Sequence, residues 1–124
     1  MHGFKTRLRG LVIILAAFMG ASPVHAETAE ENYRLYCAQC HGTQGNGQGI
    51  NNTLGGLAVS PRNHTNVMEM SKLSDAEIRL AIAEGGDAVQ KSELMPAWGA
   101  TISAEEIDDL VLYLRKLCKC AETK

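Results

Sequence analysis

The sequence predicts a small all-α protein whose helices are joined by long loops. Three segments repeat their apolar residues at the helical spacing of three and four positions, and no segment has the strict alternation of a half-buried strand. Residues 42–56 include six glycines. Loops of this length are uncommon in compact domains unless they serve a function, and enclosing a cofactor is one such function.

The N-terminal segment has the pattern of a secretory signal peptide. Lys5, Arg7 and Arg9 precede an apolar run of 11 residues, Leu11–Ala21, and "SPVHA" ends in small residues suited to cleavage after Ala26. The run is shorter than the about 20 residues that a membrane span needs. We therefore expect cleavage, no membrane span in the mature chain and export, in a bacterium to the periplasm, with an uncleaved anchor as the alternative.

Cleavage would divide the chain into residues 1–26 and one mature domain, residues 27–124. The signal segment contains three of the 12 Lys and Arg and none of the 14 Asp and Glu, which leaves nine basic against 14 acidic residues and a net charge of −5. Nucleic acids and anionic lipids bind clustered cations, so this charge balance argues against both as partners. The mature domain is near the size at which a lone core is only modestly stabilising, and a bound apolar cofactor would add core volume.

The first two predicted helices have clear boundaries. The first runs from about Glu27 to Gln39, with Tyr33, Tyr36 and Cys37 at helical spacing. The second opens with "SDAE", Ser74–Glu77, a capping box in which the serine and glutamate side chains satisfy orphan amides. Its apolar positions Ile78, Ala81 and Ile82 share one face, and Gly85-Gly86 ends it.

The third predicted helix has the strongest apolar stripe. It opens with a second capping box, "SAEE", Ser103–Glu106. The stripe consists of Ile107, Leu110, Val111, Leu114, Leu117 and Cys118. The carboxylates of Glu105, Glu106, Asp108 and Asp109 fit a solvated face and the favourable charge of a first turn.

The chemistry of the chain centres on "CAQCH", Cys37–His41. Cys-x-x-Cys-His is the attachment signature of c-type haem. Cys37 and Cys40 would form the two thioether bonds to one porphyrin, and His41 would be the proximal ligand of its iron. Gly42 would let the backbone turn away without a Cβ in the way.

Two other sites use closely spaced cysteines. A thioredoxin-like dithiol needs a βαβ context, which the sequence lacks. A structural zinc site needs four ligands, usually in two pairs. Cys118 and Cys120 are the remaining pair, but their single intervening residue falls outside the usual spacing. Both alternatives are therefore disfavoured relative to haem.

With these motifs in place, the chain resembles a monohaem class I cytochrome c over nearly all of residues 27–124. "YRLYCAQCHG" is similar to the family's first helix and haem motif, "LMPAWG" to its distal-ligand loop, and "EEIDDLVLYLRKL" to its last helix. The resemblance implies the cytochrome c fold, with three main helices and long loops around one covalent haem c. It also implies an aromatic contact between Tyr33 and Tyr113 where the first and last helices cross.

The distal iron ligand is expected to be Met95. It stands 54 residues after His41, enough for the chain to wrap a haem, and the adjacent Pro96 fixes the backbone. Met68 and Met70 are expected to fill gaps in the core, and His64, in a polar turn, to be solvated. The family often uses a proline carbonyl to bind the proximal histidine. The resemblance offers Pro61 for this role, with an ordinary loop proline as an equal alternative.

Cys118 and Cys120 depart from the family pattern. In an oxidising compartment two such thiols seldom stay free. A bond between them, a disulfide-linked dimer and a tether to a partner all remain open, and a thiolate ligand in place of Met95 is a remote option.

The expected function is one-electron transfer between a redox donor and a redox acceptor, with His41 and Met95 as axial ligands and no enzymatic activity. Two alternatives remain. One is a haem subunit docked permanently on an oxidase or reductase. The other is a haem with an open site, acting as a peroxidase or binding a gas.

Overall fold

The computed structural model describes residues 27–121, and every regular element in this range is helical. The predicted signal segment, residues 1–26, lies outside the described residues. The elements in chain order are α1 (Ala29–Asn32), η1 (Tyr33–Cys37), α2 (Ala38–His41), α3 (Ile50–Thr53), α4 (Val67–Met70), α5 (Asp75–Glu84), η2 (Asp87–Val89) and α6 (Ala104–Cys118). The all-α prediction is confirmed. None of these helices is long and apolar enough to cross a membrane.

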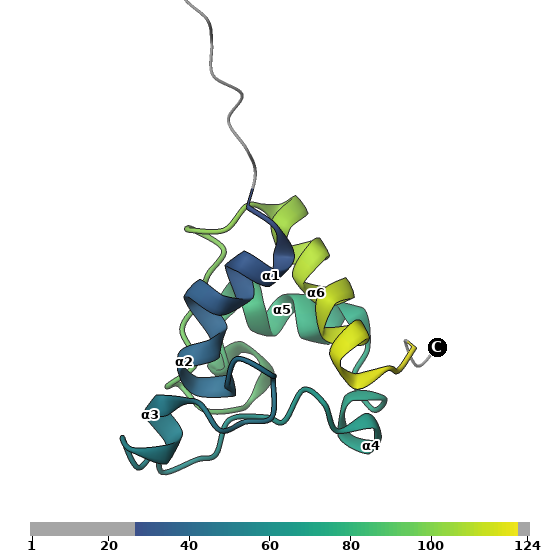
Figure 1. Ribbon diagram of the computed structural model, residues 1–124. Helices are drawn as coiled ribbons and strands as arrows, with labels where there is room; N and C mark the ends of the chain where they lie inside the picture. Colours follow the sequence, from purple (N-terminus) through teal and green to yellow (C-terminus); the bar gives the residue numbers. More distant parts are fainter. Residues whose placement is uncertain (1–26, 122–124) are drawn as a thin grey trace, which may run out of the picture.

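The first predicted helix is present as α1, η1 and α2, which follow one another without a break (Figure 1). It begins with a capping box: the Thr28 hydroxyl accepts from the Glu31 amide, and the Glu31 carboxylate accepts from the Thr28 amide. In η1 the Ala38 amide donates to the carbonyl of Tyr33, five residues earlier, so this turn is a π turn. Such turns are frequent at functional sites, and this one leads directly into the cysteine motif.

The first and last helices pack side by side (Figure 1). The rings of Tyr33 and Tyr113 lie 5.3 Å apart between centroids, so the aromatic contact implied by the family resemblance is present. Beside it the side-chain amide of Asn32 donates to the Glu106 carboxylate at 3.3 Å. This crossing fixes the start of the motif-bearing helix against α6.

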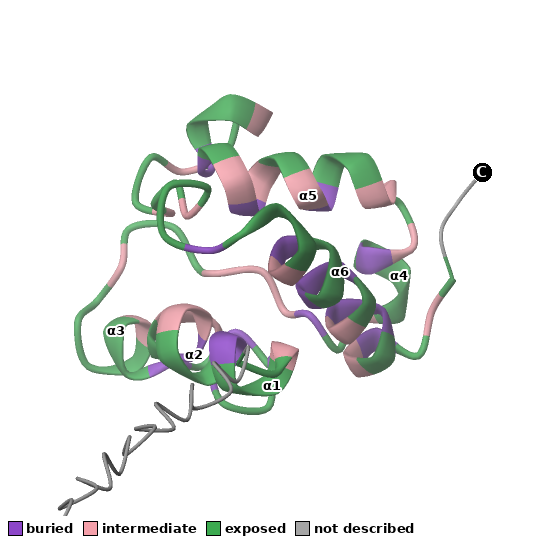
Figure 2. Cartoon of the chain, turned by 90° about the horizontal axis from the view of Figure 1, so that it is seen from above, coloured by how far each residue is buried: buried purple, intermediate pink, exposed green. Residues whose placement is uncertain are grey.

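Both predicted capping boxes form. Ser74 caps α5 and Ser103 caps α6, each paired with the glutamate three residues later. The inward side of α6 is a buried stripe, seen in purple in Figure 2, and its members are Ile107, Leu110, Val111, Leu114, Arg115 and Cys118. The helix pattern in the sequence therefore gave the positions of both helices and the buried face of α6.

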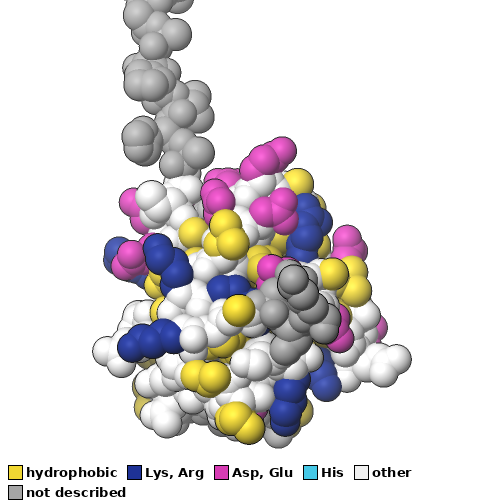
Figure 3. All heavy atoms as spheres, turned by 90° about the vertical axis from the view of Figure 1, so that its right-hand side faces the viewer, with side chains coloured by type: hydrophobic (Ala, Val, Ile, Leu, Met, Phe, Trp, Pro, Cys, Tyr) yellow, Lys and Arg dark blue, Asp and Glu magenta, His cyan; other side chains and the backbone are white. Residues whose placement is uncertain are grey.

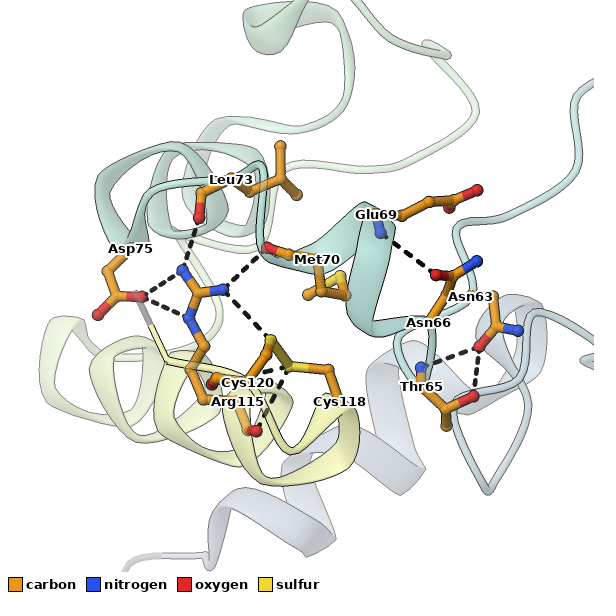
Figure 4. The surroundings of a disulfide bond; sticks show 10 residues. All are labelled: Asn63, Thr65, Asn66, Glu69, Met70, Leu73, Asp75, Arg115, Cys118 and Cys120. Atoms are coloured by element: carbon orange, nitrogen blue, oxygen red, sulfur yellow. Dashed lines mark hydrogen bonds and ion pairs between the residues drawn. A yellow bond between two sulfur atoms is a disulfide. The ribbon is translucent and has the colours of Figure 1, made fainter. Parts of the chain in front are cut away.

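The end of α6 is joined to α4 and α5 through Arg115 (Figure 4). Its guanidinium donates to the carbonyls of Met70 at 2.9 Å and Leu73 at 2.7 Å, and to the Asp75 carboxylate at 2.7 Å. Only 8% of Arg115 is exposed. A buried cation thus links three elements.

Cys118 and Cys120 form a disulfide with each other, just past this arginine (Figure 4). Of the pairings that the sequence left open, the structure has the one within the chain. Both sulfur atoms are used in this bond, so neither cysteine is a free thiol in the structure. The bond spans Lys119, the residue after the end of α6, whose backbone is in the left-handed conformation.

Charged side chains lie over the outside of the molecule. On the face seen in Figure 3, Lys and Arg side chains are interspersed with Asp and Glu and with hydrophobic side chains. Glu105, Asp108 and Asp109 are exposed, as predicted for a solvated helix face, whereas the fourth carboxylate of that prediction, Glu106, is half-buried.

Candidate functional site

A cavity of about 520 Å³ lies between the N-terminal helical segment, α5, α6 and the two long loops. This volume falls within the about 300–1,000 Å³ of small-molecule sites. Cys37, Cys40, His41 and Met95, the residues expected to hold a cofactor, all line it. Its apolar walls are formed mainly by Leu57, Val59, Met70, Leu73, Ile78, Ala81, Ile82, Leu94, Leu110 and Leu114.

The two cysteines of the motif enter this cavity from the π turn and from α2. Neither is in a disulfide. Burial, with a smaller contribution from the neighbouring Cys40, raises the pKa of Cys37 to about 12. The Cys37 thiol is therefore protonated in this structure.

The glycine-rich loop after the motif folds back on α2. Gly42 ends the helix at φ +81°, a conformation that favours glycine. The Gly49 amide donates to the Cys40 carbonyl at 3.0 Å. A Cβ on Gly49 would lie 2.3 Å from the carbonyl oxygen of Gln39, so no side chain fits there. These contacts hold the C-terminal end of α2, and with it the position of His41.

The His41 imidazole has a backbone partner on its Nδ1. The ring nitrogen lies 2.9 Å from the carbonyl oxygen of Arg62. The family resemblance suggested the carbonyl of Pro61, but the acceptor in the structure belongs to the next residue, Arg62. Burial lowers the pKa of His41, which favours the neutral imidazole that binds metals. With Nδ1–H donating to Arg62, Nε2 is the nitrogen left for a metal ion.

His64 is buried, contrary to the expectation that it would be solvated. Only 8% of the residue is exposed. Its ring stacks on that of His41 with centroids 4.2 Å apart and planes 18° apart, and its Nδ1 lies 2.9 Å from the Tyr33 hydroxyl. Burial lowers the pKa of His64 well below its usual value, so the ring is neutral. The residues around His64 indicate only a polar turn, and no local pattern points to these distant partners.

Met95 lies in a loop that is anchored on the end of α5. Its carbonyl accepts from the Gly86 amide at 3.0 Å, and the amides of Trp98 and Gly99 donate to the carbonyls of Ile82 and Ala83. A Cβ on Gly85 would lie 2.9 Å from the Met95 carbonyl oxygen. Gly85-Gly86, expected only to end the helix, thus also lets the methionine loop approach closely.

The other two methionines differ from each other. Met70 is 1% exposed and packs in the core, as expected, while also lining the cavity. Met68 is 74% exposed and does not line the cavity, so the expectation that it fills a core gap is wrong. The exposed position makes Met68 unsuited to bind a group inside the cavity.

The residues around the cavity fit a haem. Two free thiols and a neutral imidazole come from one helical segment, a thioether comes from a distant loop, and the remaining wall is largely apolar. Within residues 27–121 no group of three or more His, Cys, Asp or Glu side chains is arranged to hold a metal ion by itself. This donor set therefore suits a macrocycle that brings its own iron, rather than a zinc ion held by four side chains.

Comparison with known proteins supports this assignment. Residues 25–114 match the family model described as cytochrome C oxidase, cbb3-type, subunit III. A solved structure described as KustC0563 c-type cytochrome is similar to this chain, with 26% sequence identity and a TM-score of 0.58 over 73% of this chain and 98% of that one. No curated protein sequence matches the chain. The cytochrome c fold expected from the resemblance is confirmed.

Proposed function

Because the chain belongs to the family described as cytochrome c oxidase, cbb3-type, subunit III, and is a small c-type cytochrome with covalently bound haem c, we propose that it is a periplasmic one-electron carrier. Members of such families generally carry electrons and are typically exported or anchored to a membrane. The finer assignment, a carrier without enzymatic activity that moves between a donor and an acceptor, is our own.

One observation carries the proposal: Cys37, Cys40, His41 and Met95 line a single apolar cavity. Cys37 and Cys40 would hold the porphyrin through thioether bonds. His41 would bind the iron through Nε2, and Met95 would bind it through its thioether sulfur. The haem iron supplies the one-electron couple, and a histidine–methionine ligand pair raises its reduction potential.

The surrounding residues keep the site in one geometry. The Arg62 carbonyl fixes the proton of His41 on Nδ1, and the Gly86 amide holds the backbone of Met95. Such fixed ligands suit a carrier, since little has to rearrange when an electron arrives or leaves. No residue at the site is required as an acid, a base or a nucleophile.

Apolar side chains that line the cavity also reach the surface. Val59 is 57% exposed and Leu94 is 53% exposed. An electron donor or acceptor could approach the cofactor here through a small and transient contact, as is usual for redox encounters.

The test is the optical spectrum of protein that has been exported and matured in a host with haem-attachment machinery. We expect the haem to stay bound to the denatured wild-type chain. When Cys37 and Cys40 are both changed to Ala, the denatured chain should carry no covalently bound haem. We also expect a long-wavelength methionine-to-iron band in the ferric protein. Met95→Ala should abolish this band, and Met68→Ala, which changes an exposed methionine, should leave it intact.

The same spectra separate the competing functions. A high-spin ferric spectrum in the wild-type protein, without the methionine band, would replace the carrier by an open-site haem protein that binds a gas or reacts with peroxide. A band that survives Met95→Ala would overturn the ligand assignment alone.

The family description favours one second candidate, a haem subunit docked permanently on an oxidase. Isolation of the native protein by gentle membrane and soluble fractionation distinguishes the two. A free carrier is recovered alone in the soluble fraction, whereas a subunit is recovered in a stoichiometric complex that persists through size-exclusion chromatography.

A further inference from the structure

The stacked pair of His41 and His64 suggests a role for a residue that the proposed function leaves unused. His64 lines the same cavity and lies face to face with His41, at 4.2 Å between ring centroids. Its burial would be costly unless its polar atoms were paired. The structure supplies a partner for Nδ1 from a different element, the hydroxyl of Tyr33 in η1.

A single hydrogen bond does not fully fix the His41 imidazole. The Arg62 carbonyl holds Nδ1, and a metal at Nε2 would hold the other side of the ring. A hydrogen bond and a metal bond of ordinary strength still allow the ring to rock about its Cβ–Cγ bond. A flat ring packed against its face restricts that motion, and His64, with its plane 18° from that of His41, is placed to do so.

His64 is itself held on several sides. Its amide donates to the Gly45 carbonyl at 2.6 Å, and its ring meets the ring of Tyr33 edge to face at 5.8 Å between centroids. At Gly45 a Cβ would lie 2.9 Å from Leu117 and 3.3 Å from the Cβ of His64, so the loop fits tightly around it. This packing makes His64 a firm support for the neighbouring ring.

Tyr33 connects the support to the core. It is fully buried, and it packs on Tyr113 of α6. Burial raises the pKa of Tyr33 above its usual value, so the hydroxyl keeps its proton and can donate it to Nδ1 of His64. A continuous set of contacts then runs from α6 through Tyr33 and His64 to His41.

We propose that His64 is a positioning residue that fixes the plane of the His41 imidazole through ring stacking, with the Tyr33 hydroxyl holding His64 in place. This inference rests on the proposed function, because it takes His41 to be the proximal iron ligand. A fixed imidazole plane gives the iron one defined electronic anisotropy, so His64 acts on the cofactor without touching the iron.

The test uses the mature holoprotein and two spectra that report the axial ligand plane: the ferric EPR g values and the hyperfine-shifted haem methyl resonances in the proton NMR spectrum. His64→Ala removes the stacked ring, and we expect altered g values and a changed order or spread of the methyl resonances. His64→Phe keeps a flat ring, and we expect the wild-type pattern to be largely retained.

Tyr33→Phe removes only the hydroxyl and should give a smaller change in the same direction as His64→Ala. Tyr113→Phe is the matched control, since it removes a hydroxyl from the partner ring while the Tyr33–His64 hydrogen bond stays in place, and it should leave both spectra unchanged. Urea unfolding of each variant separates a loss of stability from a change in the ligand plane. If His64→Ala does not fold, His64→Leu, which removes the flat ring and keeps most of the side-chain volume, takes its place in every comparison.

Two results would overturn the proposal. One is a His64→Ala protein with wild-type g values and methyl resonances, even if it unfolds more easily, because His64 would then be only structural. The other is a His64→Phe protein that changes as much as His64→Ala, because stacking would then not be the cause. Failure of the proposed function would be seen earlier, in a wild-type protein without the low-spin methionine-ligated spectrum, and the inference would fall with it.

Discussion

Arg115 allows a quantitative test of how the last helix is held to the rest of the domain. Replacing it with methionine keeps most of the length and apolar volume of the side chain and removes the guanidinium. The carbonyls of Met70 and Leu73 then lose a charged donor at 2.9 Å and 2.7 Å, in a place where Arg115 itself is 8% exposed. The Asp75 carboxylate also loses its partner, but 36% of that side chain is exposed and water can replace the guanidinium.

The two carbonyls dominate the expected loss. Leaving a buried acceptor without a donor costs about 1–3 kcal/mol, which applies to the Leu73 carbonyl, whereas the Met70 carbonyl still accepts from the Leu73 amide at 3.2 Å and loses one of two hydrogen bonds. We therefore expect Arg115→Met to lower the free energy of unfolding by about 2–4 kcal/mol. The ion pair with Asp75 adds less than about 1 kcal/mol because its acidic partner is solvated. For a domain of this size, with a total stability of about 5–15 kcal/mol, the variant should be visibly weakened.

The chain contains a matched control. Arg79 of α5 pairs with Asp108 of α6, so it also joins these two helices, but its side chain is 42% exposed and that of its partner 60%. We expect Arg79→Met to cost less than about 1 kcal/mol. Urea unfolding of the ferric holoprotein, followed by far-ultraviolet circular dichroism, measures both. Equal losses for the two variants, or a loss below about 1 kcal/mol for Arg115→Met, would refute the reasoning from burial.

Three further predictions concern α6 and its end. Leu110→Ala, which removes a fully buried side chain from the cavity wall, should lower the free energy of unfolding by about 2–5 kcal/mol in urea; a loss below about 1 kcal/mol would mean that the site is not close-packed. Reduction of the Cys118–Cys120 disulfide should lower it by only about 1.5 kcal/mol, because the bond closes a very short loop; a much larger loss on titration with a thiol reductant would contradict the loop-closure account. Hydrogen bonds from the Ser103 amide and hydroxyl, and from Asn32, lower the pKa of Glu106 in the folded state, so its contribution to stability is present above the unfolded pKa and disappears as the pH falls through the folded pKa. Glu106→Gln should therefore be less stable than the wild type at neutral pH, and the two proteins should become equally stable in acid. A difference in the free energy of unfolding that stays constant in urea titrations across this pH range would argue against the linkage.

Local sequence signals were sufficient to predict where the helices around the site begin. The capping boxes at Ser74 and Ser103 gave the starts of α5 and α6, because a cap involves only residues three positions apart. The apolar stripe of α6 gave its buried face. The attachment motif was equally local, since it lies within five residues of the chain.

Features that depend on distant parts of the chain were missed. The burial of His64 follows from its contacts with Tyr33, which is 31 residues earlier in the chain, and with His41. Both partners belong to the N-terminal helical segment, whereas His64 lies in a loop. His41 contacts the Arg62 carbonyl instead of that of Pro61, because the backbone conformation of this loop depends on its contacts with distant residues. No local pattern indicated a role for Arg115, because its partners are two backbone carbonyls more than 40 residues earlier in the chain.

The wide turn at Tyr33–Cys37 has a consequence for how this segment tolerates change in length. Each residue of an α-helix advances the chain by about 100° around the axis. A π turn takes up one extra residue, so the helical segments before and after it keep their relative orientation. Before the turn, Asn32 and Tyr33 contact α6; after it, Cys40 and His41 line the cavity. Deleting one residue within the turn would restore regular α-helical winding with this phase kept, whereas deleting one residue from a regular part of the helix would rotate the cysteines and histidine by about 100° relative to the contacts with α6.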